Sequence, residues 1–454
     1  MTAHPSPETL ALFAEGDPSV DRAEIAAHLE ECESCALYVE AAREMLSELE
    51  RGEVLQFLRD LPAARERVKE SHHYLDFKRA AERRRAEVAA VEQLFPMLVK
   101  HPVREWLTIL RGSPEQCTIP MADRILEEAE LLLDEQPAEA LRLVDLADEL
   151  LNEVDAAHPV MLTTARGDVW RQRSNAYRHL FRLQDALNAA ILAEHTYRQL
   201  DSPEFSVALA QNTRAVALFK MTRLNEALDL NIAASNMLRT FGPSLPFAKS
   251  LMFEAGIRLE QGFIAKAQGL WRQALLVLES LSDPKQKAAR EIARCLANLA
   301  ECSYRLGDYV DAAEASAKAM ARYRGLRMET EAIRSAWTLA LCQLHCGDPS
   351  ALDALDLAAQ QFEDLQMFGD AGFVRLDIAE ELLRREEWDR AEPLARQLVA
   401  LFTRAGVTIA SVQALDYLRQ SVIHRLATPD VVQYVRAYVT ADDPGRAFAP
   451  PGVH

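Results

Sequence analysis

The chain has 454 residues, of which 49% are apolar and 26% are charged, and its formal net charge is −18 at pH 7. This length exceeds what one hydrophobic core supports, so we expect several domains or a repeat array. The negative charge argues against direct binding to nucleic acid, and the lack of a long apolar run or a signal peptide argues against a membrane protein, so we expect a soluble, cytoplasmic protein.

Three potential metal ligands lie close together near the start of the chain, where His28, Cys32 and Cys35 form the pattern H-x3-C-x2-C. On a helix, His28 and Cys32 share one face and Cys35 follows about one turn later. Thiolate and imidazole ligands select zinc over hard cations. A fourth ligand must come from elsewhere, and the nearest candidate is His4, the only other His or Cys among the first 70 residues. The alternative is a helix end with two incidental cysteines and no metal.

The sequence around these residues resembles the zinc-binding anti-sigma domain of bacteria. Segments 4–16 and 25–29 match the family's upstream ligand, short helix, glycine-containing turn and second helix running into the histidine. The resemblance covers about residues 1–50 and implies one structural Zn2+ held by His28, Cys32, Cys35 and His4, with a sigma factor as partner. The upstream ligand is usually Cys in this family, and many members continue into a transmembrane helix, so this sequence departs from the family twice.

The charge of the first fifty residues supports a protein partner, because twelve Asp or Glu residues occur there with only Arg22 and Arg43 as cations. Such an acidic domain is suited to covering a basic, DNA-binding surface on another protein. The simpler alternative is that these acids only solvate a small helical domain.

Residues 51–115 are locally basic and carry amphipathic apolar stripes, which predict a helical connector. Pro62 and Pro96 are expected to divide this connector into separate helices. The family resemblance implies that a helix from about residue 36 to residue 58 docks on the sigma factor. Alternatively, these helices only join the domains and pack against the first repeat.

An internal repeat occupies residues 116–440. Anchor alanines recur at intervals of 39 to 46 residues, at Ala140, Ala186, Ala227, Ala267, Ala312, Ala351 and Ala391. Another alanine follows seven residues after each anchor except the last, and a Ser or Ala precedes six of them by eleven or twelve residues. Small residues on consecutive helices let their axes approach closely, which predicts stacked antiparallel helix pairs. Turn signals at residues 307–309, 347–349 and 386–388 lie where the pairs should fold back.

This pattern resembles the tetratricopeptide repeat, although the period exceeds that family's usual length. We therefore predict an all-α protein with a small zinc-binding helical domain, a connector and an α-solenoid of tetratricopeptide-like helical hairpins. Residues 441–454 contain three prolines and are expected to be disordered or loosely attached. The resemblance implies a scaffold that binds other proteins.

Polar residues on the first helices of the pairs are candidates for a partner groove. Asn175, Asn212 and Asn298 fall near positions at which related repeats hold the backbone or terminal carboxylate of a peptide. Positive charge in the same groove would come from Arg171, Arg294 and Arg334. Asn and Arg are also ordinary on helix surfaces, so the alternative is a solvated face without a function.

Other patterns that carry chemistry are weaker. Cys342, His345 and Cys346 could ligate a metal or sense oxidants on one predicted helix, but such residues more often pack inside a repeat. The sequence has no phosphate-binding loop, dinucleotide-binding turn, metalloprotease helix or nucleophile elbow, so we do not expect an enzyme.

The preferred hypothesis is a soluble anti-sigma-like regulator, which sequesters a sigma factor through its zinc domain and binds a signal, a second protein or a peptide through its solenoid. One alternative is an adaptor or scaffold whose zinc domain docks an unrelated protein. Another is a signalling protein whose N-terminal site buffers or senses metal. In a redox variant of the preferred hypothesis, oxidation of Cys32 and Cys35 ejects the zinc and releases the partner.

Overall fold

The computed structural model describes residues 5, 9, 10, 13, 14, 21–32, 35, 36, 39, 43, 74–113, 116–154, 159–281, 288–443 and 447–450. These residues form helices and their connections, with no strand among them, which confirms the all-α prediction. No helix in this described part is both long enough and apolar enough to cross a lipid bilayer. The chain divides into two compact units, Met1–Ile257 with Val277–Gln286, and Arg258–Leu276 with Lys287–His454.

The helices of each unit follow one another along the chain. The first unit contains α2 (Arg22–Glu31), α5 (Tyr74–Leu98), α6 (Val103–Arg111), α7 (Ile119–Leu132), α8 (Pro137–Leu151), α9 (Pro159–His179), α10 (Leu183–Tyr197), α11 (Glu204–Lys220) and α12 (Leu224–Arg239). The division between the units crosses α13 (Leu245–Glu260) and α14 (Ile264–Glu279). The second unit continues with α15 (Ala289–Leu306), α16 (Tyr309–Gly325), α17 (Glu329–His345), α18 (Ala351–Asp364), α19 (Phe368–Arg384), α20 (Trp388–Ala405), α21 (Ile409–Ile423) and α22 (Pro429–Ala441).

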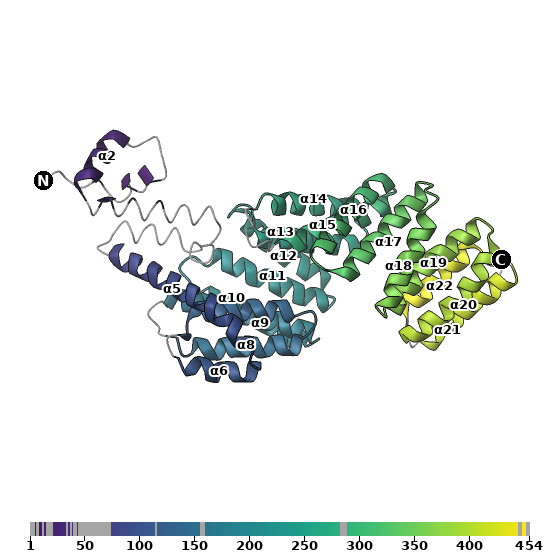
Figure 1. Cartoon of the computed structure of the whole chain (residues 1–454), viewed down its shortest axis with the longest axis horizontal. Coiled ribbons are helices and arrows are strands. Elements are labelled where there is room, and N and C mark those ends of the chain that lie inside the picture. The colour runs from purple at the N-terminus through teal and green to yellow at the C-terminus, as the bar shows by residue number, and fades with distance from the viewer. Residues whose placement is uncertain are drawn as a thin grey trace. The chain divides into compact units, whose positions relative to one another are not determined.

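The repeat residues lie where the helices of a pair approach most closely. All seven anchor alanines are completely buried, and the residues seven positions later are at most 2% exposed. On α9, Ser174 takes the small position of the first helix and donates a hydrogen bond from its hydroxyl to the carbonyl of Ala186 at 2.7 Å. Consecutive helices pack side by side, as Figure 1 shows for α8 to α11. The predicted stacking of helix pairs is confirmed.

Two glycines allow an even closer approach between the helices of a pair. A Cβ atom on Gly167 of α9 would lie 2.2 Å from the Tyr197 ring of α10, and one on Gly372 of α19 would lie 2.6 Å from the Phe402 ring of α20. Any side chain larger than a hydrogen atom would overlap with these rings. Each glycine therefore leaves the space for a buried aromatic ring on the neighbouring helix.

The predicted fold-back turns contain residues with left-handed backbone. Gly307 and Gly347 have φ values of 85° and 78°, and Glu386 has a φ of 59°. Glycine adopts this conformation without steric cost and therefore ends a helix readily. At Glu386 the same turn forms without glycine, because the packing of α19 against α20 holds the two helices in place.

The second half of the connector packs onto the first helix pair. Phe95 and Leu98 of α5 and Trp106 of α6 are buried in one core with side chains of α7 and α8. The rings of Phe95 and Trp106 meet edge to face with their centroids 5.7 Å apart. α5 also reaches α7 through an ion pair of 3.1 Å between Arg84 and Asp123. These described residues therefore belong to the core of the first repeat.

The helix break expected at Pro96 occurs slightly later in the chain. α5 includes Pro96 and ends at Leu98, and α6 begins at Val103. A proline lacks one backbone donor and disturbs the turn before it, so the helix stops within a turn of Pro96 instead of at it. Pro62 and most of the docking helix expected over residues 36–58 lie outside the described residues.

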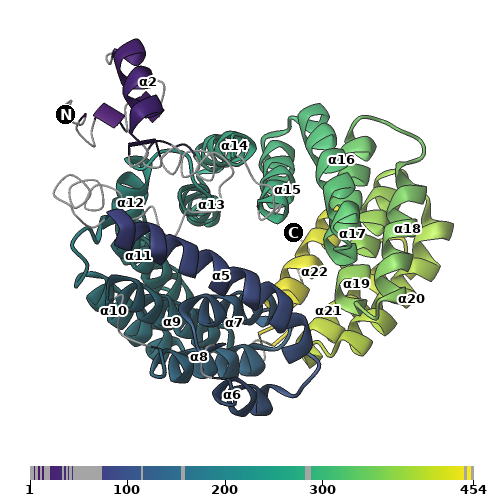
Figure 2. The same cartoon turned by 60° about the vertical axis from the view of Figure 1, so that its left-hand side comes forward.

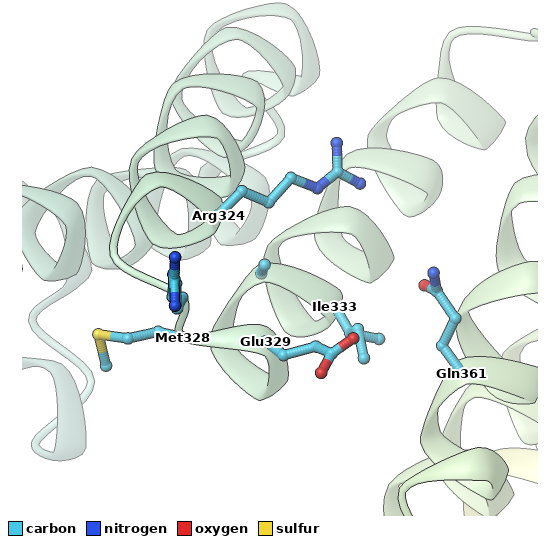
Figure 3. Close-up of a pocket in the computed structure, with 7 residues that line it drawn as sticks. Arg324, Met328, Glu329, Ile333 and Gln361 are labelled. Atoms are coloured by element: carbon cyan, nitrogen blue, oxygen red, sulfur yellow. The ribbon is translucent and has the colours of Figure 1, made fainter.

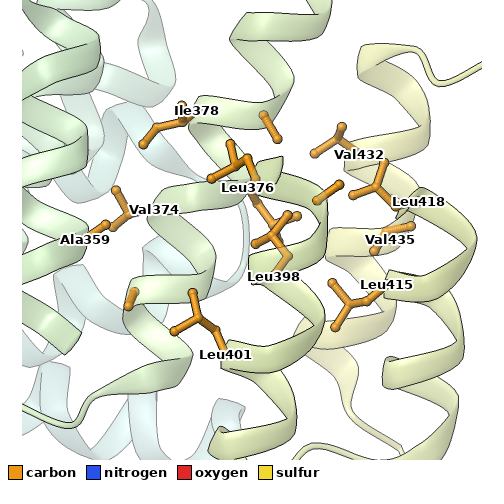
Figure 4. Close-up of a cluster of buried hydrophobic side chains, with 14 of the residues drawn as sticks. Ala359, Val374, Leu376, Ile378, Leu398, Leu401, Leu415, Leu418, Val432 and Val435 are labelled. Atoms are coloured by element: carbon orange, nitrogen blue, oxygen red, sulfur yellow. The ribbon is translucent and has the colours of Figure 1, made fainter. Parts of the chain in front are cut away.

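The second unit has a large aliphatic core that α17 to α22 share. Figure 4 shows Leu376 and Leu398 interleaved with Leu418 and Val435 from the last two helices. α22 packs back against α19, as Figure 2 shows, and Arg436 pairs there with Asp377.

Among the described residues of the C-terminal tail, Phe448 contacts the last helix pair, whereas residues 447, 449 and 450 are exposed, and the disorder expected for the tail stays a prediction. The Phe448 ring lies with its centroid 5.2 Å from that of Tyr438 and 5.7 Å from that of Tyr417. Tyr434 donates a hydrogen bond from its hydroxyl to the carbonyl of Ala449 at 2.6 Å. These contacts join Phe448 and Ala449 to the last two helices, and the proline content did not indicate them.

Candidate functional site

α2 positions the first of the predicted zinc ligands. Its N-terminus is capped by Asp21, whose carboxylate accepts hydrogen bonds of 3.1 Å from the backbone N–H groups of Ala23 and Glu24. His28 lies in the last turn of the helix. Cys32 follows that turn with an extended backbone, and its N–H donates to the carbonyl of His28 at 2.9 Å. The helix therefore ends between these two ligands, which leaves the chain free to turn toward the third.

Cys35 begins the next helical turn and completes a compact group of donors. The imidazole of His28 and the Sγ atoms of Cys32 and Cys35 offer ligand atoms that all lie within 4.8 Å of one another. A tetrahedral zinc ion with Zn–S bonds of about 2.3 Å separates its sulfur ligands by roughly 3.8 Å. Small side-chain rotations would therefore bring the three donors onto one metal ion, and thiolate and imidazole are ligands that soft and borderline metals prefer.

The core around this group is small. Its buried members within the described residues are Leu10, Phe13, Ile25, Cys35 and Val39. Arg22 and Arg43 both lie over the Phe13 ring, with guanidinium carbons 4.7 and 5.4 Å from its centroid. The two cations of the first fifty residues thus help to cover this core. His4, the expected fourth ligand, lies outside the described residues, so this part of the ligand set stays a prediction.

Groove candidates of the first unit are engaged in hydrogen bonds between or along helices. Arg171 pairs with Asp168 on the same helix at 3.2 Å. The amide of Asn175 donates to the side chain of Gln172 at 2.9 Å. Asn212 of α11 accepts a hydrogen bond of 3.4 Å from the hydroxyl of Ser250, which belongs to α13. Each of these contacts uses only part of the hydrogen-bonding capacity of the side chain.

Groove candidates of the second unit lie nearer to solvent. Arg294 is exposed on α15, and Asn298 donates from its amide to the backbone carbonyl of Arg294 at 2.8 Å. Arg334 of α17 pairs with Asp370 of α19 at 3.2 Å. The role of all six groove residues in binding a partner stays a prediction.

A buried and a half-buried carboxylate on the first helices, Asp168 and Asp123, were missed by the sequence interpretation. Asp168 is 5% exposed and accepts a hydrogen bond of 2.8 Å from the hydroxyl of Tyr197. Asp123 on α7 lies beside Arg84, and burial raises its pKa to about 7, although Arg84 acts to lower it. The sequence did contain one indication of such a residue. Asp168, next to Val169, is acidic at a position where the helical pattern predicts an apolar side chain.

The three residues of the C-x2-H-C pattern do not share one environment: Cys342 is buried, whereas Cys346 is exposed and His345 stacks on an aromatic ring. Cys342 is fully buried, and burial raises the pKa of its thiol to about 11. The His345 ring stacks on Tyr309 with centroids 4.2 Å apart, and its Nε2 lies 3.1 Å from the hydroxyl of Tyr304. Within the described part of the chain, the group at residues 28–35 is the one set of His, Cys and acidic side chains that is close enough to hold a metal.

Comparisons with known proteins identify the fold of the array. No protein-family model matches the sequence, and no curated protein is recognisably similar to it. The crystal structure of the apo form of RapI superposes with a TM-score of 0.53 at 14% identity, covering 71% of this chain and 87% of that one. A signal-transduction ATPase with a tetratricopeptide repeat sensor from Pyrococcus horikoshii has a TM-score of 0.50 at 15% identity, covering 93% of this chain and 66% of that one. At these identities the likeness concerns the fold, a tetratricopeptide-like solenoid, which confirms the predicted fold class.

Proposed function

We propose that this protein is an anti-sigma-like regulator, in which the acidic N-terminal module binds a sigma factor and keeps it from RNA polymerase. The observation that carries this proposal is the group formed by His28, Cys32 and Cys35, which could hold a metal ion at the end of α2. The module precedes a tetratricopeptide-like array, a fold suited to presenting a long surface to a second protein or peptide. In this proposal the protein acts in the cytoplasm and is not an enzyme.

In this proposal Zn2+ is structural. His28, Cys32 and Cys35 would hold it, with His4 as the expected fourth ligand. When bound, zinc supplies cross-links and folding energy to a segment whose described core is very small. The twelve acidic residues of the first fifty would then face a basic, DNA-binding surface of the sigma factor.

Co-purification of the full chain tests the proposal. A candidate sigma factor would be co-expressed with the wild-type chain, the double variant Cys32→Ser/Cys35→Ser, and the control Cys346→Ser, which changes an exposed cysteine of the array. We expect the wild type and the control to retain the sigma factor and the double variant to lose it together with zinc. A complex that survives the loss of zinc, or no complex with any sigma factor of the same cell, would contradict the proposal.

A second candidate function is that of an adaptor whose N-terminal module docks a protein unrelated to sigma factors. The tetratricopeptide-like fold favours it equally, because this fold serves many assemblies. The same experiment, followed by identification of the retained proteins, separates the two functions. A zinc-dependent partner that is not a sigma factor would support the adaptor.

A further inference from the structure

A small pocket lies in the second unit, beside the turn that joins α16 to α17. It has a volume of about 260 Å³ and is lined by Arg324, Arg327, Met328, Glu329, Ala332, Ile333 and Gln361. This volume corresponds to roughly nine water molecules of 30 Å³ each. The pocket is therefore suited to a molecule about as large as an amino acid and too small for a folded segment.

Two arginines line the pocket. Arg324 and Arg327 are exposed, and neither guanidinium has an ion pair or hydrogen bond to any described residue. In contrast, Arg334 and Arg375 of the same unit are paired with carboxylates. Two guanidinium groups at one pocket favour a carboxylate, because their planar N–H pairs match its two oxygens.

The beginning of α17 adds to the attraction for a carboxylate. Met328 occupies its N-cap position and offers no side-chain hydrogen bond to the first-turn N–H groups. The positive end of the α17 dipole therefore lies at the edge of the pocket, although Glu329 and Glu331 in the same first turn partly offset it. Figure 3 shows Arg324 and Gln361 extending from two different helices on opposite sides of this helix start.

The remaining wall is apolar at its base and acidic at its rim. Ala332 and Ile333 are 4% and 5% exposed and form the base. Glu329 places its carboxylate beside Ile333, as Figure 3 shows. A ligand that satisfies all of these groups carries a carboxylate, a cationic group and a short apolar side chain.

We propose that this pocket binds a free aliphatic α-amino acid. Its carboxylate would pair with Arg324 and Arg327, its ammonium group with Glu329, and its side chain would cover Ala332 and Ile333. The proposal concerns side chains of the second unit alone and does not depend on the identity of the protein that the N-terminal module binds.

Calorimetric titration of the full chain with L-leucine tests this proposal. We expect saturable binding, weakened about tenfold by Arg324→Gln and by Arg327→Gln, since each change removes a charge-assisted hydrogen bond. Glu329→Gln should lower the affinity for leucine by only about threefold, because an ion pair with a carboxylate that is exposed to water contributes little. The matched control is Arg322→Gln, an exposed arginine on α16 that does not line the pocket and should leave the affinity unchanged.

Ligand analogues separate the three contacts. 4-Methylpentanoate lacks the ammonium group and should therefore bind the wild type more weakly than leucine does. The change Glu329→Gln should leave the affinity for this analogue unchanged or increase it. Removing the carboxylate, as in 3-methylbutylamine, or the side chain, as in glycine, should abolish measurable binding. The proposal is overturned if about 10 mM leucine gives neither heat nor thermal stabilisation, if 4-methylpentanoate binds as tightly as leucine, or if Arg322→Gln acts like Arg324→Gln. Circular dichroism of each variant verifies that it is folded.

Discussion

The N-terminal module and the repeat array bury apolar surface by different means. The described core of the module consists of five side chains, one of which is the thiol of Cys35. The core of the second unit alone extends over six consecutive helices. In the module, a proposed metal ligand is thus also a core residue, whereas the array depends on many small contacts along the chain.

Because of this difference, we expect the two regions to lose their folded structure in different ways. A region with few buried side chains needs a cross-link, such as a metal, and fails as a whole when the cross-link is removed. In a repeat array each pair contacts only its neighbours, so damage stays near the altered residue. The following predictions test this contrast, in order of decreasing expected effect.

The largest effect is expected from Cys35→Ser in the module. Serine removes a thiolate ligand and a buried core atom together, so the chain should lose its zinc and the order of its first residues. Binding of structural zinc is worth on the order of 10 kcal/mol in small domains. Zinc content per chain, with protease sensitivity of the segment before α5, measures this loss.

The helicity and melting temperature of the array should stay unchanged in Cys35→Ser. Treatment of the wild type with a strong chelator should reproduce the effect of the variant. A chain that keeps one zinc without Cys35 would show that the site is not the one formed by His28, Cys32 and Cys35.

A smaller effect is expected from Gly372→Ala in the array. The new Cβ would lie 2.6 Å from the buried Phe402 ring, so α19 and α20 must separate locally. Overpacking of this kind costs about 1–3 kcal/mol. The midpoint of thermal or denaturant unfolding, read from helicity, measures it.

The matched control for Gly372→Ala is Gly269→Ala, where no atom lies within 4 Å of the new Cβ. Alanine is the better helix former, so this control should be neutral or more stable by about 0.5–1 kcal/mol. Equal destabilisation by both changes would argue against the close approach of α19 and α20.

The third effect concerns pH and the carboxyl group of Asp123 in the first helix pair, and between pH 5 and pH 8 it is similar in size to that of Gly372→Ala. Burial raises its pKa from 3.8 to about 7. The folded chain therefore holds this proton more tightly than the unfolded chain. Its contribution to stability is fully present below about pH 3.8 and is lost as the pH rises through about 7. The whole contribution is about 4 kcal/mol, of which roughly 2–3 kcal/mol is lost between pH 5 and pH 8.

Asp123→Asn should flatten the decline in melting temperature between about pH 5 and pH 8. The exposed Asp229→Asn on α12 is the control and should keep the wild-type profile. Arg84→Met should shift the decline to higher pH, since Arg84 acts to lower the pKa of Asp123. A profile that Asp123→Asn leaves unchanged would mean that this carboxyl group is well solvated.

The array could be predicted from sequence because its signal is repeated. Seven anchor alanines at regular spacing define which faces meet, and the buried positions follow from that register. The metal group was predictable for a related reason: its three ligands lie within eight residues, so they come close together even though α2 ends before Cys32 and does not run through the group.

The polar contacts of the array could not be predicted in the same way. Asn212 reaches Ser250 across 38 residues, and Tyr197 reaches Asp168 across 29. Such pairs depend on the exact rotation of each helix, which a pattern of small and apolar residues does not specify. The small pocket was missed for the same reason, since Arg324 of α16 and Gln361 of α18 line one pocket only because of how these helices pack.

The packed residues after α22 have a further consequence for how the molecule behaves in concentrated solution. A stack of helix pairs exposes an apolar face at its last member, where another copy could add and begin a filament. Phe448 covers Tyr417 and Tyr438 at this end. The Phe448 ring therefore covers apolar surface of the last described helix pair that would otherwise be open to a neighbouring chain.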